Sequence, residues 1–179
     1  MEAGERDGEL DELGLLRQGQ TLMAPLGALT NKDLVQALAS RGVTSFALEL
    51  IPRITRAQSM DILSSQANLA GYKAVLLAAN NYGRIFPQMM TPGGTLAPSR
   101  SFIMGVGVAG LQAIATARRL GSVVTATDVR PATKEQVESL GAKFLAVEDE
   151  EFKNAQTAGG YAKEMSKEYQ AKQAELVSS

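Results

Sequence analysis

A short glycine-rich turn between two apolar segments constrains the fold of this chain more than any other feature. Residues 100–131 begin with an apolar strand pattern and continue through a G-x-G-x-x-G turn made by Gly105, Gly107 and Gly110. An apolar helical segment follows, then a second strand pattern that ends in Asp128. This order of strand, turn, helix, strand and acid predicts a parallel βαβ unit whose turn approaches a ligand closely.

Each glycine of the turn has its own predicted role. Gly105 permits the tight turn, Gly107 removes a side chain that would block a pyrophosphate, and Gly110 lets the helix pack close to the strand. The free N–H groups and the positive dipole end of the following helix attract phosphates. The pattern therefore predicts a dinucleotide-binding domain of the Rossmann type. The alternative is a glycine-rich βα turn that binds no ligand.

The acid at the end of the second strand indicates which dinucleotide is preferred. Asp128 lies 18 residues after Gly110 (128 − 110), where the acid that binds a ribose 2′-hydroxyl is expected. A carboxylate there would repel a 2′-phosphate, so NAD(H) is favoured over NADP(H). Arg130 weakens this preference, because a nearby arginine can receive a phosphate.

Composition excludes several functional classes. The chain has 179 residues, a net charge of −1, no Cys and no His, which removes disulfides, thiolate metal sites and the commonest metal ligand and general acid/base. We therefore expect no metal site. Neither a basic surplus for nucleic acid nor an apolar run of membrane-spanning length is present in the sequence. The acidic start lacks the apolar core of a secretory signal.

The predicted fold class is α/β. A disordered start (1–13) precedes part of an N-terminal α/β lobe with a long connecting helix (14–99) and a Rossmann-type parallel sheet in residues 100–179. That sheet supplies only strands 1–3, the first half of a complete Rossmann domain. Strand 1 would then expose an unpaired backbone edge. We therefore expect an internal fragment of a longer protein, or a second chain that supplies the missing strands.

Turn and cap residues predict the smaller elements. In the first lobe, strands are expected at 20–24 and 44–50, a helix from a cap at Thr30 to about residue 41, a helix from about 56 to 82, and a loop over 83–99. Gly71 is predicted to mark a close helix crossing. After the glycine turn, a helix at 133–140, a strand at 143–147, a polar stretch at 148–160 and a helix at 161–177 are expected.

A second group of polar residues surrounds Arg53. Gln58 and Asp61 are three residues apart, as are Asp61 and Ser64, so one helix would present them on one face. A structural interpretation is also available and needs no ligand, with Thr55 and Gln58 as a capping box and Arg53 paired with Asp61. The chemistry of these residues alone leaves both interpretations open.

The amino-acid sequence of several segments resembles that of the NAD(H)-binding component of proton-translocating nicotinamide nucleotide transhydrogenase, and more distantly that of alanine dehydrogenase. The resemblance covers almost everything from about residue 16 to residue 177. The segments that carry it are 26–30, 52–72, 105–117, 128–141 and 159–165.

The resemblance implies roles for individual residues. Gln58 would lie at the hydride-transfer site, with Arg53 and Asp61 as its catalytic companions. A loop over residues 153–164 would close over the nucleotide as a lid, with Gly160 and Tyr161 as its contacts; the alternative there is a plain helix start. The cofactor-binding residues implied are Arg53, Ile54, Thr55, Arg56, Gln58, Asp61 and Ser64 for the nicotinamide end, Gly105, Gly107, Val108, Ala109 and Gly110 for the pyrophosphate, Asp128, Val129 and Arg130 for the adenosine ribose, and Gly160 and Tyr161 in the lid.

The resemblance also implies a reaction and its partners. NADH bound here would reduce NADP⁺ bound on a separate domain, and the full complex would couple this step to proton translocation. Because the cofactors carry the chemistry, a site without His and Cys is compatible with it. The implied partners are an NADP(H)-binding domain and a membrane-embedded domain, with a homodimer in the parent protein. The implied location is the cytoplasmic face of the inner membrane, reached through those partners and without direct membrane insertion.

Two alternatives differ from this interpretation. An alanine dehydrogenase-like oxidoreductase would need an acid/base group, typically His, which the chain lacks. The second is a non-catalytic, truncated fragment of a nucleotide-binding domain, which binds nothing or serves only as a folding or association partner for the missing half, because a half sheet exposes an edge that favours association. The isolated fragment is accordingly expected to be inactive in transhydrogenation.

Overall fold

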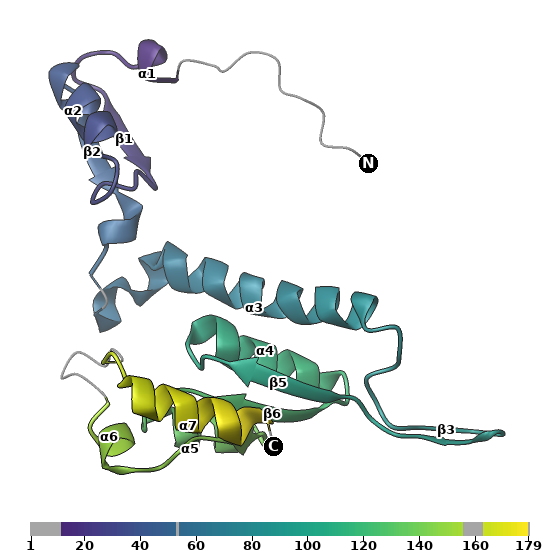
Figure 1. Cartoon of the computed structure of the whole chain (residues 1–179). Coiled ribbons are helices and arrows are strands. Elements are labelled where there is room, and N and C mark those ends of the chain that lie inside the picture. The colour runs from purple at the N-terminus through teal and green to yellow at the C-terminus, as the bar shows by residue number, and fades with distance from the viewer. Residues whose placement is uncertain (1–11, 53, 156–162, 179) are drawn as a thin grey trace. The chain divides into compact units, whose positions relative to one another are not determined.

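The structure, a computed structural model, describes residues 12–52, 54–155 and 163–178. Contacts divide the chain into two units, Met1–Leu63 and Ser64–Ser179. Both units contain parallel strands joined through helices (Figure 1), which confirms the predicted α/β class. The domain boundaries expected from the sequence, near residues 14 and 100, stay predictions.

The first unit is a small βαβ arrangement. Helix α1 (Glu12–Leu15) precedes strand β1 (Thr21–Ala24), which pairs in parallel with β2 (Thr44–Ala47). Helix α2 (Lys32–Ser40) connects the two strands. The buried core of this unit consists of Leu26, Leu38 and Val43.

Two sequence predictions in this unit are wrong. The cap of α2 is Asn31 and not Thr30, because the Asn31 side chain accepts the N–H of Leu34 (3.2 Å) while the Thr30 hydroxyl donates to the Gly27 carbonyl (3.1 Å). Strand β2 stops at Ala47, and the 3₁₀ helix η1 (Leu48–Leu50) follows. That turn lets the Glu49 carboxylate accept the N–H groups of Leu26 (3.0 Å) and Ala28 (2.8 Å).

The long helix predicted over residues 56–82 is in two pieces. The 3₁₀ helix η2 (Thr55–Met60) is separated from α3 (Ile62–Asn81) by Asp61, whose ψ of 89° is not helical. Thr55 is already the first helical residue and follows Ile54, which has no side-chain cap hydrogen bond. The predicted capping box of Thr55 and Gln58 is therefore wrong.

The second unit contains the predicted three-stranded parallel sheet. Strands β5 (Arg100–Met104), β6 (Val123–Thr127) and β7 (Lys143–Phe144) lie in the order β5-β6-β7. Helices α4 (Val108–Arg119) and α5 (Thr133–Ser139) make the two crossovers. This is the strand 1–3 half of a Rossmann sheet. Its core contains Ile114, Ala126 and Val137, one residue from each of α4, β6 and α5, all fully buried.

Three elements of this unit differ from their predictions. The predicted loop over 83–99 contains an antiparallel hairpin, β3 (Met89–Thr91) and β4 (Gly94–Leu96). Strand β7 has two residues in place of the predicted five (143–147). The chain leaves the sheet before Val147, whose N–H bonds to the Gln173 side chain (2.8 Å). A short helix, α6 (Glu150–Lys153), lies in the predicted polar stretch.

The last helix begins later than predicted. Helix α7 (Lys167–Ser178) starts after Ser166, whose hydroxyl accepts the N–H of Tyr169 (3.1 Å). That hydroxyl also bonds to the Glu151 carboxylate (2.7 Å). A serine that caps in this way defines a helix start, and the periodicity of residues 161–177 did not reveal it.

The predicted close helix crossing at Gly71 is confirmed. Helix α3 runs beside α4 (Figure 1), and a Cβ built on Gly71 would lie 2.0 Å from the carbonyl oxygen of Ala109. No larger residue fits there without moving the first turn of α4, which follows the glycine turn.

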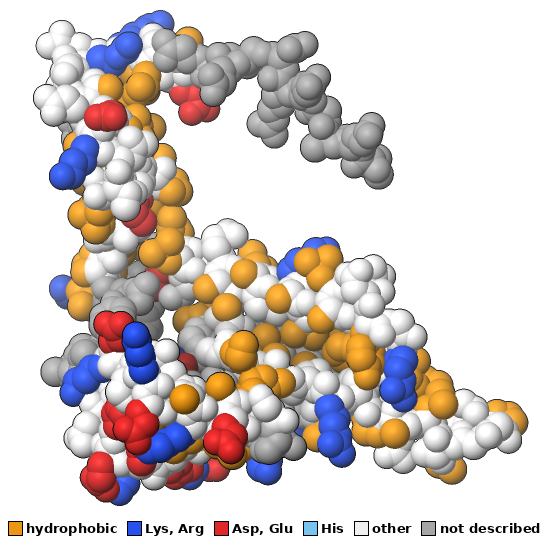
Figure 2. Space-filling view, viewed as in Figure 1, with side chains coloured by type: hydrophobic (Ala, Val, Ile, Leu, Met, Phe, Trp, Pro, Cys, Tyr) orange, Lys and Arg blue, Asp and Glu red, His pale blue; other side chains and the backbone are white. Residues whose placement is uncertain are grey.

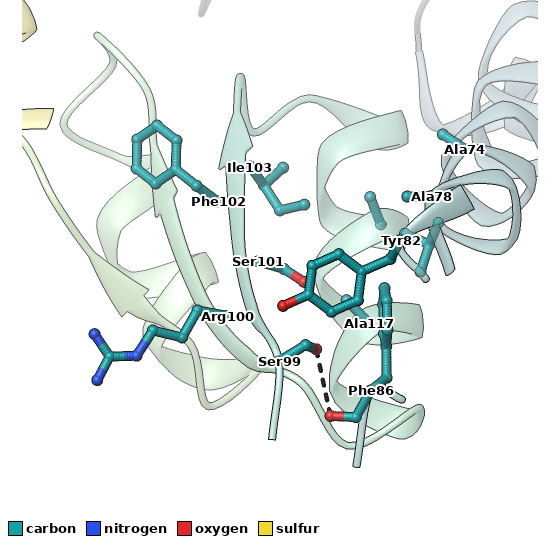
Figure 3. Close-up of a pocket in the computed structure, with 12 residues that line it drawn as sticks. Ala74, Ala78, Tyr82, Phe86, Ser99, Arg100, Ser101, Phe102, Ile103 and Ala117 are labelled. Carbon is teal, nitrogen blue, oxygen red and sulfur yellow. Dashed lines mark hydrogen bonds between the residues drawn. The ribbon is translucent and has the colours of Figure 1, made fainter. Parts of the chain in front are cut away.

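The outer edge of β5 lies open within the part of the chain that the structure describes. Strand β5 pairs with β6 alone there, as predicted for strand 1, and a cavity of about 360 Å³ lies beside it (Figure 3). The Tyr82 and Phe86 rings line this cavity and meet edge to face, with their centroids 5.9 Å apart. Figure 2 shows apolar side chains gathered over this unit, and Met104 at the end of β5 is 75% exposed.

Candidate nucleotide-binding site

The glycine turn joins β5 to α4, and two of its glycines are required by the fold itself. Gly105 has a φ of +89°, a conformation that L side chains rarely adopt. A Cβ built on Gly110 would lie 1.9 Å from the Gly105 carbonyl oxygen. The tight turn and the close helix packing predicted for these two positions are therefore present.

Gly107 differs from its two neighbours in the motif. Its φ of −81° is open to any residue, and nothing lies within 4 Å of a Cβ built there. Neither the backbone nor the packing of the described residues demands a glycine. Gly107 is also the residue before α4, whose first N–H groups, at Val108, Ala109 and Gly110, have no acceptor within the helix. Open space thus adjoins a set of N–H donors suited to an anion.

Asp128 follows β6 and is tied to the glycine turn. Its Oδ2 accepts the N–H of Val106 (2.7 Å), and its Oδ1 accepts the backbone N–H of Arg130 (2.8 Å). The Arg130 guanidinium adds two bonds to the same carboxylate, from Nε to Oδ1 (2.9 Å) and from Nη2 to Oδ2 (2.8 Å). Arg130 Nη2 also donates to the Val106 carbonyl (3.1 Å). This ion pair, which follows β6, therefore also holds the residue after β5 through Val106.

Electrostatics keep this pair ionised. Burial favours the neutral acid, but the Arg130 side chain and the N–H groups of Val106 and Arg130 outweigh it and lower the pKa of Asp128 below its ordinary value. The hydrogen bonds that the Arg130 side chain donates to Asp128 raise the pKa of Arg130 in turn, against the opposing effect of burial. Only 7% of the Asp128 side chain is exposed, against 25% of Arg130.

A cavity of about 490 Å³ opens beside these residues. Gln173 of α7 closes one wall of it, and sequence reasoning missed this residue. Its Nε2 donates to the Thr127 hydroxyl (3.0 Å), and its Oε1 accepts the Val147 N–H (2.8 Å). A glutamine on a charged helix far along the chain gives no pattern that could have indicated this. The lining residues are Gly105, Gly107, Thr127, Asp128, Val129, Arg130 and Gln173.

The structure brings together one of the two predicted groups of site residues. Gly105, Gly107 and Gly110 lie with Asp128 and Val129 around or beside the cavity just described. The nicotinamide group lies along the junction of η2 and α3. Among its members, Ile54, Thr55, Arg56 and Gln58 are exposed, and Asp61 and Ser64 are half-buried.

The single helix face predicted for Gln58, Asp61 and Ser64 is not present. Gln58 is in a 3₁₀ turn, Asp61 is at the break, and Ser64 is in α3. Arg53, Gly160 and Tyr161 lie outside the described residues. Of the predicted lid, the two flanks are described, and the Lys163 N–H bonds to the Ala155 carbonyl (2.8 Å) across its base.

Among residues 12–52, 54–155 and 163–178, no group of three or more His, Cys, Asp or Glu side chains has an arrangement that could hold a metal ion. Within the same ranges, no helix combines the length and apolarity needed to cross a bilayer.

Comparison with known proteins identifies two matching domain models. The model described as Alanine dehydrogenase/PNT, C-terminal domain, matches residues 74–178, and the corresponding N-terminal domain model matches residues 6–70. An NAD(P) transhydrogenase subunit alpha protein of Rhodospirillum rubrum is 64% identical over 167 residues, which are 93% of this chain and 44% of that protein.

Solved structures agree with this pattern. The crystal structure of transhydrogenase from Sinorhizobium meliloti is 56% identical with a TM-score of 0.80, over 94% of this chain and 44% of that one. An L-alanine dehydrogenase structure is 25% identical with a TM-score of 0.59, over 74% of this chain and 38% of that one. The chain thus spans less than half the length of the relatives it matches.

Proposed function

The chain belongs to the alanine dehydrogenase/PNT family, and on that premise we propose that it is the NAD(H)-binding part of a nicotinamide nucleotide transhydrogenase. The observation that carries this proposal is Gly107, a glycine that neither its backbone conformation nor its neighbours require. A pyrophosphate close to the backbone is the reason for a glycine there. The identity of 64% to a transhydrogenase subunit, against 25% to an alanine dehydrogenase structure, supports the choice of reaction.

The glycine turn and α4 hold the pyrophosphate in this proposal. The first-turn N–H groups of Val108, Ala109 and Gly110 donate to it, and the helix dipole favours its charge. Asp128 and Val129 take the adenosine ribose at the wall of the cavity of about 490 Å³, with Arg130 beside them. A carboxylate there favours NAD(H) over NADP(H).

The residues predicted between Arg53 and Ser64 bind the nicotinamide end of the cofactor in this proposal. Gln58, Arg53 and Asp61 position the ring for hydride transfer to NADP⁺ on a separate domain, assisted by Ile54, Thr55, Arg56 and Ser64. The bound nicotinamide supplies the redox chemistry, and these residues supply position. Residues 153–164 close over the nucleotide and exclude water, with Gly160 and Tyr161 as contacts.

The resemblance to transhydrogenases supports the same proposal for partners. The chain works beside an NADP(H)-binding domain and a membrane-embedded domain, at the cytoplasmic face of the inner membrane, and the assembly couples hydride transfer to proton translocation. A homodimer in the parent protein fits the large apolar side chains on the hairpin, where Met90 is 83% and Leu96 46% exposed.

The proposal is tested first by binding. We expect NADH to bind this chain saturably by nicotinamide fluorescence, NADPH to bind more weakly, and Gly107→Ala to weaken NADH binding by about tenfold or more, because a methyl group would displace the pyrophosphate from charge-bearing hydrogen bonds. The thermal unfolding temperature of the variant should stay close to that of the parent, since nothing lies within 4 Å of a Cβ at residue 107. A Gly107→Ala chain that binds NADH as well as the parent would refute the site.

The nicotinamide group requires a separate test in the full-length parent protein. Gln58→Ala should lower transhydrogenation at least about tenfold while changing NADH affinity far less, because a misplaced ring loses its reactive geometry before it loses its binding. The matched control is Gln36→Ala, an exposed glutamine of α2 in the same unit. Unchanged turnover in Gln58→Ala would remove Gln58 from the proposed site.

A second candidate function is favoured by the open edge of β5. Strand β5 has one described partner and ends at Met104, which is 75% exposed, and such an edge favours association with another chain. In that case the chain is a non-catalytic module. The same titration separates the two candidates, because the module would bind neither dinucleotide while the full-length parent bound NADH.

A further inference from the structure

We propose that Arg130 is a displaceable cover on Asp128 and that this cover sets how strongly the site distinguishes NAD(H) from NADP(H). The inference rests on the proposed function and deepens it. It follows from how completely the carboxylate is already bonded and from which of its partners can leave.

The Asp128 carboxylate has no spare acceptor site in the observed arrangement. A carboxylate accepts about four hydrogen bonds through its two oxygens. Val106 donates one, the Arg130 backbone a second, and the Arg130 guanidinium two more, all between 2.7 and 2.9 Å. The side chain is correspondingly 7% exposed. A ribose hydroxyl can bond to Asp128 only after one of these donors has left.

Only the guanidinium can leave without unfolding the turn. The N–H groups of Val106 and Arg130 are backbone groups, held by the glycine turn and by the chain after β6. The Arg130 side chain is the more exposed partner, at 25%, and lines the same cavity as Asp128. Binding of a ribose diol therefore exchanges two guanidinium bonds for two hydroxyl bonds, and frees a positive charge beside the 2′ oxygen.

This exchange acts oppositely on the two cofactors. With NAD(H), breaking the ion pair opposes binding, so the cover weakens the affinity for the preferred cofactor. With NADP(H), the guanidinium stays on Asp128 through Nε and Nη2 and neutralises its charge. The N–H groups of Nη1, which take no part in these bonds, can then donate to the 2′-phosphate. Arg130 thus reduces the preference for NAD(H) over NADP(H) that Asp128 alone would give.

The test measures dissociation constants for NADH and NADPH by nicotinamide fluorescence in the 179-residue chain and its variants. In Arg130→Gln we expect tighter NADH binding, weaker NADPH binding, and an NADPH-to-NADH ratio of dissociation constants that rises about tenfold. In Arg130→Lys the paired guanidinium hydrogen bonds to Asp128 are lost but the positive charge stays. NADH should therefore bind more tightly than in the parent while NADPH binding is retained. Arg119→Gln, which removes an exposed positive charge at the end of α4, should leave the ratio unchanged.

The outcomes separate this inference from the proposed function. If the parent chain binds NADH and the ratio in Arg130→Gln is unchanged or falls, the cover is refuted and the proposed function stands. If the parent binds neither dinucleotide, both fall together. Circular dichroism and thermal unfolding show whether Arg130→Gln folds. If it does not fold, the NADH affinity of Arg130→Lys is the deciding measurement, and NADH binding weaker than in the parent refutes the cover.

Discussion

Gly110→Ala is expected to destabilise the second unit by about 3 kcal/mol or more, because the new methyl group would overlap a backbone atom. The added Cβ would lie 1.9 Å from the Gly105 carbonyl oxygen. Gly105 cannot easily move aside, since its N–H is bonded to the Thr127 carbonyl (2.9 Å). Helix propensity alone predicts the opposite sign, as alanine is better than glycine in a helix by about 1 kcal/mol. Chemical denaturation followed by circular dichroism measures the difference.

Gly107→Ala is the matched control for this prediction. It makes the same chemical change three residues earlier, where nothing lies within 4 Å of the new Cβ. The two variants should separate stability from binding, with Gly110→Ala lowering the free energy of unfolding and Gly107→Ala lowering NADH affinity. Equal stabilities for the two variants would show that the close approach of Gly110 to Gly105 does not constrain this turn.

Asp128→Asn is expected to lower the free energy of unfolding at neutral pH by roughly 2–4 kcal/mol, the range for breaking a largely buried, hydrogen-bonded charge pair. The amide of the variant would direct N–H groups toward donors from Val106 and Arg130 and leave the guanidinium without its counter-charge. Glu148→Gln is the control. It breaks the exposed pair of Lys134 and Glu148, and surface pairs of this kind change stability little.

The same prediction has a pH dependence with a definite sign. The pKa of Asp128 is lower in the folded chain than its ordinary value of 3.8. The stability that ionised Asp128 contributes is therefore complete above about pH 4 and is lost as the pH falls through the lower folded pKa. The gap between parent and Asp128→Asn should accordingly be full at pH 7 and shrink below pH 4. A gap that stayed constant down to pH 2 would contradict this account.

Local patterns were sufficient to predict the segment of the second unit from β5 through the glycine turn and α4 to Asp128, because its signals are short in sequence. Each signal can be recognised within a short stretch of the sequence. These signals are the turn at Gly105, the order of strand, helix and strand, and the acid at residue 128. The structure confirms three parallel strands in the predicted order and a close crossing at Gly71. In the first unit, by contrast, the sequence predicts Thr30 as the cap of α2 and the structure has Asn31, because neighbouring polar residues offer similar caps and only the backbone path selects one.

Contacts between distant residues account for what could not be predicted. Gln173 reaches Thr127 and Val147 only because α7 folds back onto the ends of the strands, and no periodicity encodes that. The glycines and Asp128 were sufficient by themselves to indicate a dinucleotide site, since their spacing dictates local geometry. Whether the Asp128 carboxylate is open or covered was decided only by the tertiary structure, because the Arg130 guanidinium spans two strand ends to reach both Asp128 and the Val106 carbonyl.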